Sequence, residues 1–216
     1  MNSVDSAATG ATLVEQPESF EFTPENLRVA EAHIAKYPPG RQASAVLPLL
    51  DLAQRQSGGW LPRAAMDRVA QMLGMAPIRV YEVGSFYTMF NLRPVGRYLL
   101  QACTTTPCWL RGSDAVVGAC ERKLGIGVGG STTDGLFTLV EVECLGACVN
   151  APILQVNDDF YEDLDGPATE TLIDALRAGN PPPPGSAIGR HGSEPLGGRT
   201  TLTEPAAEAA AGPERT

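Results

Sequence analysis

The chain has 216 residues, enough for one medium domain or two small ones, and 43% of them are hydrophobic, as is ordinary for a globular protein. Its formal net charge of −9 argues against nucleic acid as a partner, because nucleic-acid affinity comes mainly from basic contacts to phosphate. No apolar run approaches the ~20 residues of a membrane-spanning helix, so we expect no direct membrane insertion.

The amino-terminal stretch, residues 1–22, contains no Lys or Arg and has four acidic residues. A signal peptide begins with basic residues and a transit peptide is rich in Arg, so this stretch resembles neither. We therefore expect a cytoplasmic protein from a bacterium. Residues 1–19 are small, polar and acidic, and we expect them to be disordered.

Apolar side chains then recur with helical spacing through residues 20–92. The first of these segments begins with Thr23, which can act as an N-cap, and with Pro24, which suits a first helical turn. Four short amphipathic helices joined by short loops predict a small four-helix bundle. The expected helices lie within residues 24–37, 46–57, 61–74 and 76–87.

The pattern changes to alternating strands and helices in residues 93–179. A helix is expected over residues 113–124, with Ser113 as its N-cap, and a last helix ends at Gly179. A hairpin is expected to turn at residues 157–159. The order is strand, helix, strand, strand, strand, helix, which predicts a compact α/β domain. The strand-like stretches are YLLQA, LFTLVEVE, ILQVND and FYEDL.

From residue 180 to the end, the chain is rich in Pro, Gly, Ala and Ser and has very few bulky apolar residues. Such a segment cannot bury enough apolar surface to offset the entropy lost on ordering. We expect a disordered tail that is dispensable for folding.

The five cysteines carry the strongest chemical signal. Cys103 and Cys108 form C-x4-C, Cys144 and Cys148 form C-x3-C, and each pair follows a predicted strand. If the two strands are parallel neighbours in one sheet, their carboxyl ends are adjacent and the four thiols meet there. Structural disulfides are rare in a reducing compartment, where cysteines are more often buried small residues, metal ligands or reactive thiols. Cys120 falls inside a predicted helix and is expected to be a core residue.

Four cysteines of this kind suit either zinc or a [2Fe–2S] cluster. Zinc ribbons usually use C-x2-C, whereas the wider spacings here favour a cluster, which the chain has to wrap. Gly146 allows the backbone to approach inorganic sulfide, and residues 104–106 offer threonine hydroxyls and amides. A zinc-stabilised structural module, a thiol redox role and an accidental pairing remain alternatives at this point.

Other motifs are weaker. The stretch GIGVGG, residues 125–130, follows a predicted helix and precedes a strand, the reverse of a dinucleotide-binding turn. Residues 66–83 have the look of a helix-turn-helix, which leaves a DNA-binding regulator as an alternative although bundle helices give the same pattern. The only histidines, His33 and His191, offer little material for a nucleophilic triad.

Three stretches, FYTMFNLRPVGRY, CTTTPCWLRGS and ECLGACVNAP, resemble in order and spacing the NuoE-type subunit of NADH:quinone oxidoreductase, respiratory complex I. The resemblance covers about residues 20–179. It implies a thioredoxin-like domain after the helical bundle and no catalytic residue in the chain itself. It also implies one [2Fe–2S] cluster, bound by Cys103, Cys108, Cys144 and Cys148.

The resemblance implies an electron-transfer subunit of the H⁺-translocating enzyme, peripheral to the cytoplasmic face of the inner membrane. Its cluster exchanges single electrons with the flavin of a partner during NADH oxidation by quinone. FMN and NADH are expected only on that NuoF-type partner subunit, which assembles with further complex I subunits. Related subunits serve NAD-linked hydrogenases and formate dehydrogenases, so an equivalent diaphorase subunit remains an alternative.

Overall fold

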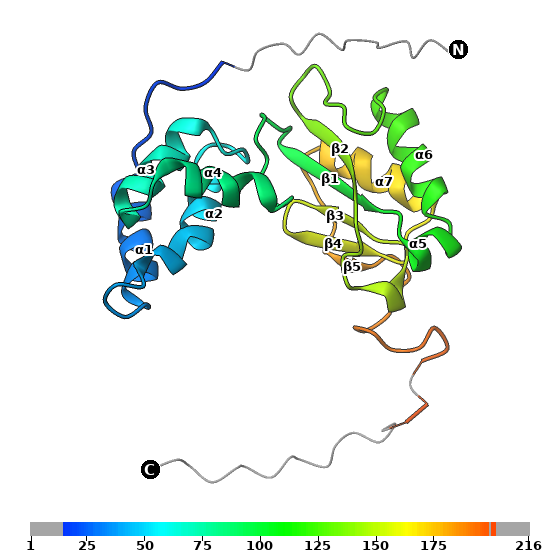
Figure 1. Ribbon diagram of the computed structural model, residues 1–216. Helices are drawn as coiled ribbons and strands as arrows, with labels where there is room; N and C mark the ends of the chain where they lie inside the picture. Colours follow the sequence, from blue (N-terminus) through cyan, green and yellow to red (C-terminus); the bar gives the residue numbers. More distant parts are fainter. Residues whose placement is uncertain (1–14, 199, 202–216) are drawn as a thin grey trace, which may run out of the picture. The chain divides into compact units, whose positions relative to one another are not determined.

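The computed structural model describes residues 15–198 and 200–201, and the chain divides into two compact units between Arg97 and Tyr98 (Figure 1). Each unit has its own hydrophobic core. The disorder expected for residues 1–14 and 202–216 lies outside the described part of the chain. Within that part, no helix is both long enough and apolar enough to span a membrane.

The first unit contains the four predicted helices and one short 3-10 turn. Thr23 is the N-cap of α1, as expected, because its hydroxyl accepts a hydrogen bond of 3.2 Å from the Asn26 amide. Gly74 ends α3 in the left-handed conformation that glycine tolerates best. The elements are α1 (Pro24–Ala35), η1 (Gln42–Ala45), α2 (Val46–Gln56), α3 (Arg63–Leu73) and α4 (Pro77–Phe86).

The core of the first unit forms between these helices. Leu49 and Leu50 of α2 pack with Val69 of α3 and Val80 of α4, and all four side chains are fully buried. Gln54 of α2 is also buried, and its side chain makes two hydrogen bonds to the segment after α4. It donates to the Met89 carbonyl at 3.0 Å and accepts from the Asn91 amide at 2.7 Å. The segment after α4 is therefore held against the helices.

The second unit is a five-stranded mixed sheet with the order β2-β1-β3-β4-β5. Strands β1 and β2 are parallel, β3 is antiparallel to β1 and to β4, and the predicted hairpin joins β3 to β4. Asn157 in its turn has a positive φ of 55°. The elements are β1 (Tyr98–Cys103), α5 (Thr106–Leu110), α6 (Ser113–Leu124), β2 (Phe137–Val142), η2 (Cys148–Asn150), β3 (Leu154–Val156), β4 (Asp159–Glu162), α7 (Gly166–Arg177) and β5 (Gly185–Ser186).

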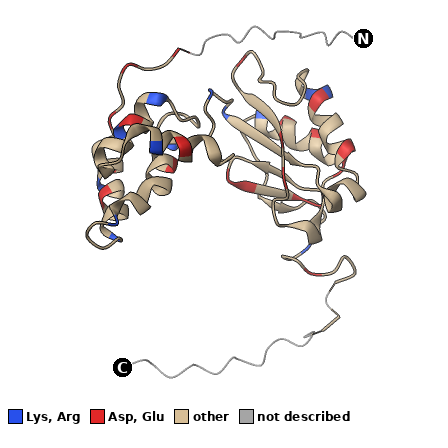
Figure 2. Ribbon diagram, in the orientation of Figure 1, with Lys and Arg blue, Asp and Glu red and all other residues tan. Residues whose placement is uncertain are grey.

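Helices α6 and α7 pack together and bury the main core of this unit with the sheet (Figure 1). Acidic and basic side chains link the two helices on their outer surface (Figure 2), with Arg122 at 3.1 Å from Glu170 and Lys123 at 2.7 Å from Asp174. These pairs are largely exposed, so each adds little stability. The packing therefore depends mainly on the apolar core.

The expected N-cap at Ser113 is wrong. Gly112, with a φ of 96°, turns the chain from α5 into α6, and Ser113 is the first residue inside the helix. The Ser113 hydroxyl is buried and has no hydrogen-bond partner. A left-handed glycine at the junction of two helices replaced the side-chain cap that the sequence suggested.

The expected disorder from residue 180 is corrected for residues 182–194. Strand β5 pairs with β4, the Tyr161 hydroxyl donates to the Pro182 carbonyl at 3.0 Å, and Arg190 forms an ion pair with Asp163. The side chains of Arg190 and Asp163 are only 8% and 2% exposed. Composition did not indicate this docking because it uses backbone hydrogen bonds and one buried charge pair, with little apolar surface.

A chain that ends at Gly179 should unfold in its second unit at a lower temperature than the full chain, in contrast to the sequence-based expectation. It loses several hydrogen bonds, each worth ~1 kcal/mol net, and each kcal/mol lowers Tm by about 2–4 °C in a chain of this size. Calorimetry of the full chain, of a chain ending at Gly198 and of a chain ending at Gly179 measures the effect. The Gly198 chain should match the full chain; equal melting of all three would contradict the docking.

Candidate metal centre

Four of the five cysteines lie at one edge of the sheet, where β1 and β2 end. Cys103 is the last residue of β1, and it stands opposite Val142, the last residue of β2. Cys108 lies in α5, directly after β1, and Cys144 and Cys148 lie in the loop after β2. The parallel pairing expected from the sequence is therefore present, and it brings both cysteine loops to the same edge.

The thiols form two close pairs that also act on each other. The sulfur atoms of Cys144 and Cys148 are 3.2 Å apart. The Cys103 and Cys108 thiols also interact directly, and Cys103 acts electrostatically on both Cys144 and Cys148. The four sulfurs thus belong to one site built from two halves.

Neighbouring hydroxyl and amide groups face the sulfur atoms. The Thr105 hydroxyl lies 3.2 Å from the Cys103 sulfur and also hydrogen-bonds to Cys144. The Gly146 amide donates to the Cys144 sulfur at 3.4 Å, which its left-handed backbone, with a φ of 84°, permits. The site therefore offers hydrogen-bond donors to negatively charged sulfur.

Each pair has one thiol whose pKa is lowered and one whose pKa is raised. Burial raises the pKa of Cys103, but hydrogen bonds from Thr105 outweigh it and lower the pKa overall; burial raises the pKa of Cys108 to about 12. The Gly146 amide lowers the pKa of Cys144, and the hydrogen bond to Cys144 raises the pKa of Cys148. One thiolate in each half is thus stabilised by the protein itself.

The donor set fits a two-iron cluster better than a single metal ion. In the described residues, no three His, Cys, Asp or Glu side chains come together closely enough to hold one ion. A structural zinc site needs four ligands around one centre, whereas a [2Fe–2S] cluster takes four thiolates, two for each iron. Two separate thiol pairs at one sheet edge match the second requirement.

The two halves of the site differ in exposure. Cys103 and Cys108 are buried, and their neighbours include Ala151 and Ile153. Cys144 is exposed and Cys148 is partly exposed. One half therefore lies inside the fold and the other faces solvent, so a bound group would be reachable from one side only.

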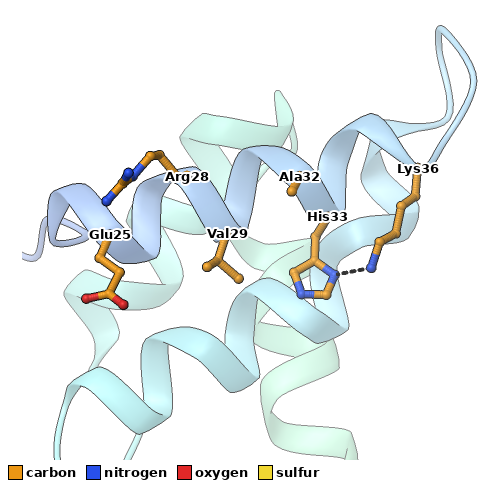
Figure 3. Close-up of a pocket in the computed structure, with 6 residues that line it drawn as sticks. All are labelled: Glu25, Arg28, Val29, Ala32, His33 and Lys36. Carbon is orange, nitrogen blue, oxygen red and sulfur yellow. Dashed lines mark hydrogen bonds between the residues drawn. The ribbon is translucent and has the colours of Figure 1, made fainter.

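The remaining candidates do not form sites. Cys120 is fully buried in α6, as expected for a core residue. Residues 125–130 lie between α6 and β2, and Gly129 donates to the Leu139 carbonyl at 2.7 Å, so this stretch is ordered against β2. His33 lies in an open depression lined by residues of one helix, α1, where its ring contacts the Lys36 ammonium at 3.2 Å (Figure 3).

The docking of the tail against this site had no signal in the sequence. Arg190 lies in a segment rich in Gly and Pro, and its partner Asp163 is one of many acidic residues. The Arg190 side chain reaches the Val149 carbonyl, next to Cys148.

Comparisons with known proteins agree with this site. The family model described as thioredoxin-like [2Fe-2S] ferredoxin matches residues 30–177. The chain is 59% identical over 159 residues to the NuoE-type subunit of NADH-quinone oxidoreductase from Rickettsia conorii, a match that covers 74% of this chain and 95% of the relative. It is 54% identical over 186 residues to the mitochondrial NADH dehydrogenase [ubiquinone] flavoprotein 2 of Dictyostelium discoideum, which covers 86% of this chain and 75% of the relative.

The second match is longer than residues 20–179, so similarity extends past the range that the motifs indicated. Among solved structures, an air-oxidised NAD⁺-reducing [NiFe]-hydrogenase has a similar fold, with a TM-score of 0.54 and 22% identity. That match covers 62% of this chain and 23% of the hydrogenase chain, so the chain spans about a quarter of that structure's length.

Cys120 should resist alkylation in the native protein. Burial raises its pKa to about 12, which lowers its thiolate fraction at pH 8 by on the order of a thousandfold relative to a free cysteine. Mass spectrometry after iodoacetamide treatment, with and without urea, measures the effect, and the urea-unfolded chain is the control. Equal labelling of Cys120 in the two samples would contradict its burial.

Proposed function

The chain belongs to the thioredoxin-like [2Fe-2S] ferredoxin family, and we propose that it is the electron-transfer subunit of the NADH dehydrogenase module of respiratory complex I. The observation that carries the proposal is the pair of thiol pairs at the aligned ends of β1 and β2. The relatives named as NuoE-type subunits of NADH-quinone oxidoreductase, at 59% identity over nearly their whole length, support this host complex.

In this proposal, Cys103 and Cys108 hold one iron of the cluster and Cys144 and Cys148 hold the other. A bound [2Fe–2S] cluster supplies a centre that takes up and releases one electron at a time. The Thr105 hydroxyl and the Gly146 amide donate to the ligand sulfurs. Such donors favour the more negative, reduced state and so raise the reduction potential.

NADH delivers two electrons together as a hydride, so a one-electron centre needs a flavin to divide the pair. We assign FMN and the NADH site to a partner subunit. This chain supplies the other part: it holds the cluster at a sheet edge, shields its Cys103 side, and leaves its Cys144 side accessible.

The surface beside the thiols has the properties of a docking face for that partner. Trp109 is 58% exposed, Leu110 is 71% exposed, and Val149 is 62% exposed. Trp109 follows Cys108 and Val149 follows Cys148, and α5 contacts η2. Large exposed apolar side chains that lie together mark interaction surfaces, and here they flank both halves of the site.

As part of such an assembly, the protein would be attached peripherally to the cytoplasmic face of the inner membrane, without inserting into the bilayer. An equivalent diaphorase subunit of a hydrogenase or formate dehydrogenase is the second candidate. The similarity to the hydrogenase, at 22% identity, supports a common fold but not a common host. The higher identity to the complex I subunits favours the first candidate.

Replacement of Cys103, Cys108, Cys144 or Cys148 by Ala should abolish or destabilise the cluster, because each removes one of four thiolate ligands. Iron and sulfide analysis with the visible absorption spectrum measures the loss. Cys120→Ala is the matched control, since it removes a buried thiol outside the site at a packing cost of ~1 kcal/mol. Wild-type iron content in any of the four variants would remove that residue from the ligand set.

The isolated chain should not oxidise NADH, because the flavin that divides the hydride belongs to the partner. The test mixes cluster-loaded protein with NADH and an artificial electron acceptor, with and without the flavin subunit. Turnover is expected only with that subunit present. Steady turnover by the chain alone, free of flavin, would overturn the assignment as an electron-transfer subunit.

A further inference from the structure

We propose that Arg190 is a positioning residue for the Cys148 half of the site. It lies in residues 182–194, the docked segment, and holds the loop of residues 144–151, the Cys148 loop, against the sheet. The inference rests on the proposed function insofar as it takes Cys148 to be a cluster ligand. It assigns a role to a part of the chain outside the range matched by the family model.

A buried charge pair attaches the docked segment. Arg190 and Asp163 form an ion pair in which both side chains are almost completely buried. The second carboxylate oxygen of Asp163 accepts from the Ser186 hydroxyl at 2.7 Å, and the Asp163 amide donates to the Asn150 carbonyl at 2.7 Å. A buried carboxylate is costly unless it is paired and hydrogen-bonded, so Asp163 requires this partner.

The same guanidinium contacts the Cys148 loop. Its Nη1 donates to the Val149 carbonyl at 3.3 Å and to the Glu194 carbonyl at 3.1 Å, while Nη2 pairs with Asp163. Only the planar fork of arginine can bond a carboxylate and two carbonyls at once. The charge that anchors the docked segment therefore also holds the residue after Cys148.

Asn150 provides a second attachment one residue further on. Its side chain is buried and donates to the Gly192 carbonyl at 2.8 Å and to the Glu162 carboxylate at 2.5 Å. The docked segment thus holds two consecutive residues of the Cys148 loop, Val149 through its carbonyl and Asn150 through its amide.

The Cys148 loop has little internal structure to position it. Its 3-10 turn, η2, has three residues, and its backbone bonds are Asn150 to Ala147 at 2.9 Å and Ala151 to Cys148 at 3.4 Å. Short 3-10 turns have poor hydrogen-bond geometry. Contacts from outside the loop therefore determine where the Cys148 sulfur lies.

The Cys103 half differs, because the sheet itself holds it. Cys103 is paired with Val142 in the ladder, and its amide donates to the Ile153 carbonyl at 3.2 Å. Loss of Arg190 should loosen the Cys148 half and leave the Cys103 half unchanged. This asymmetry separates a positioning role from general destabilisation.

The test uses the full-length, cluster-loaded protein with Arg190→Lys and Arg190→Leu. Lysine keeps the charge for Asp163 but cannot also bond both carbonyls. The double variant Arg190→Leu with Asp163→Asn removes both charges, and it serves if Arg190→Leu alone fails to fold. Tyr161→Phe is a control that weakens the docked segment at Pro182 without touching the Cys148 loop. Leu172→Ala, in the core under α7, is a control for lowered stability.

Two measurements decide. Amide hydrogen exchange in residues 144–151 should be about fivefold faster in Arg190→Lys, the change expected for one lost hydrogen bond, with residues 98–103 unchanged. The paramagnetic resonance signal of the reduced cluster should broaden in the Arg190 variants and keep its wild-type shape in both controls. Unchanged exchange and line shape in the Arg190 variants, or equal changes in Leu172→Ala, would overturn the proposal.

The outcomes also distinguish this proposal from the proposed function. If the purified wild-type chain binds no [2Fe–2S] cluster, the proposed function fails. Amide exchange of the metal-free full chain then decides alone whether Arg190 holds the Cys148 loop. If the cluster is present and exchange is unaffected by the Arg190 variants, the proposed function stands and the positioning role fails.

Discussion

The parallel pairing of β1 with β2 is the constraint on which the site depends. The two strands begin together at Tyr98 and Phe137 and end together at Cys103 and Val142, so both cysteine loops start from the same edge. Side chains alternate between the faces of a sheet, and a slip of one residue would move the core residues of β2 to its opposite face. Burial of Phe137 and Leu139 therefore keeps the ends aligned, and packing far from the thiols determines that they meet.

Negative charge at the thiols is stabilised by neutral donors. The groups that face Cys103 and Cys144 are a threonine hydroxyl and a glycine amide. The guanidinium of Arg190 comes near the site, but the carboxylate of Asp163 takes up its charge. In a chain with a net charge of −9, this arrangement supports an electron-accepting centre through local hydrogen bonds. The surface around it stays apolar and available to a partner protein.

Residues 182–194 show how a segment without an apolar face can be ordered. Its attachments are the short β5 pairing, the Tyr161 hydroxyl and the pair of Arg190 with Asp163. Each of these gains strength because its partner on the sheet is already fixed by the core of the second unit. Fixed partners reduce the entropy lost on docking, so few contacts suffice. The same few contacts reach the loop that carries Cys148.

The sequence by itself determined what depends on neighbouring residues: the four helices from their apolar period, the Thr23 cap, the hairpin at Asn157, and the two cysteine pairs after two strands. The motifs also identified the family. Only the tertiary structure decided which cysteines face solvent, that Gly112 replaces Ser113 as the helix cap, and that Arg190 pairs with Asp163, 27 residues away. Periodicity records burial of an element against its own core. A single charge pair between distant segments leaves no period in the sequence, because its partner is chosen by where the folded chain brings it.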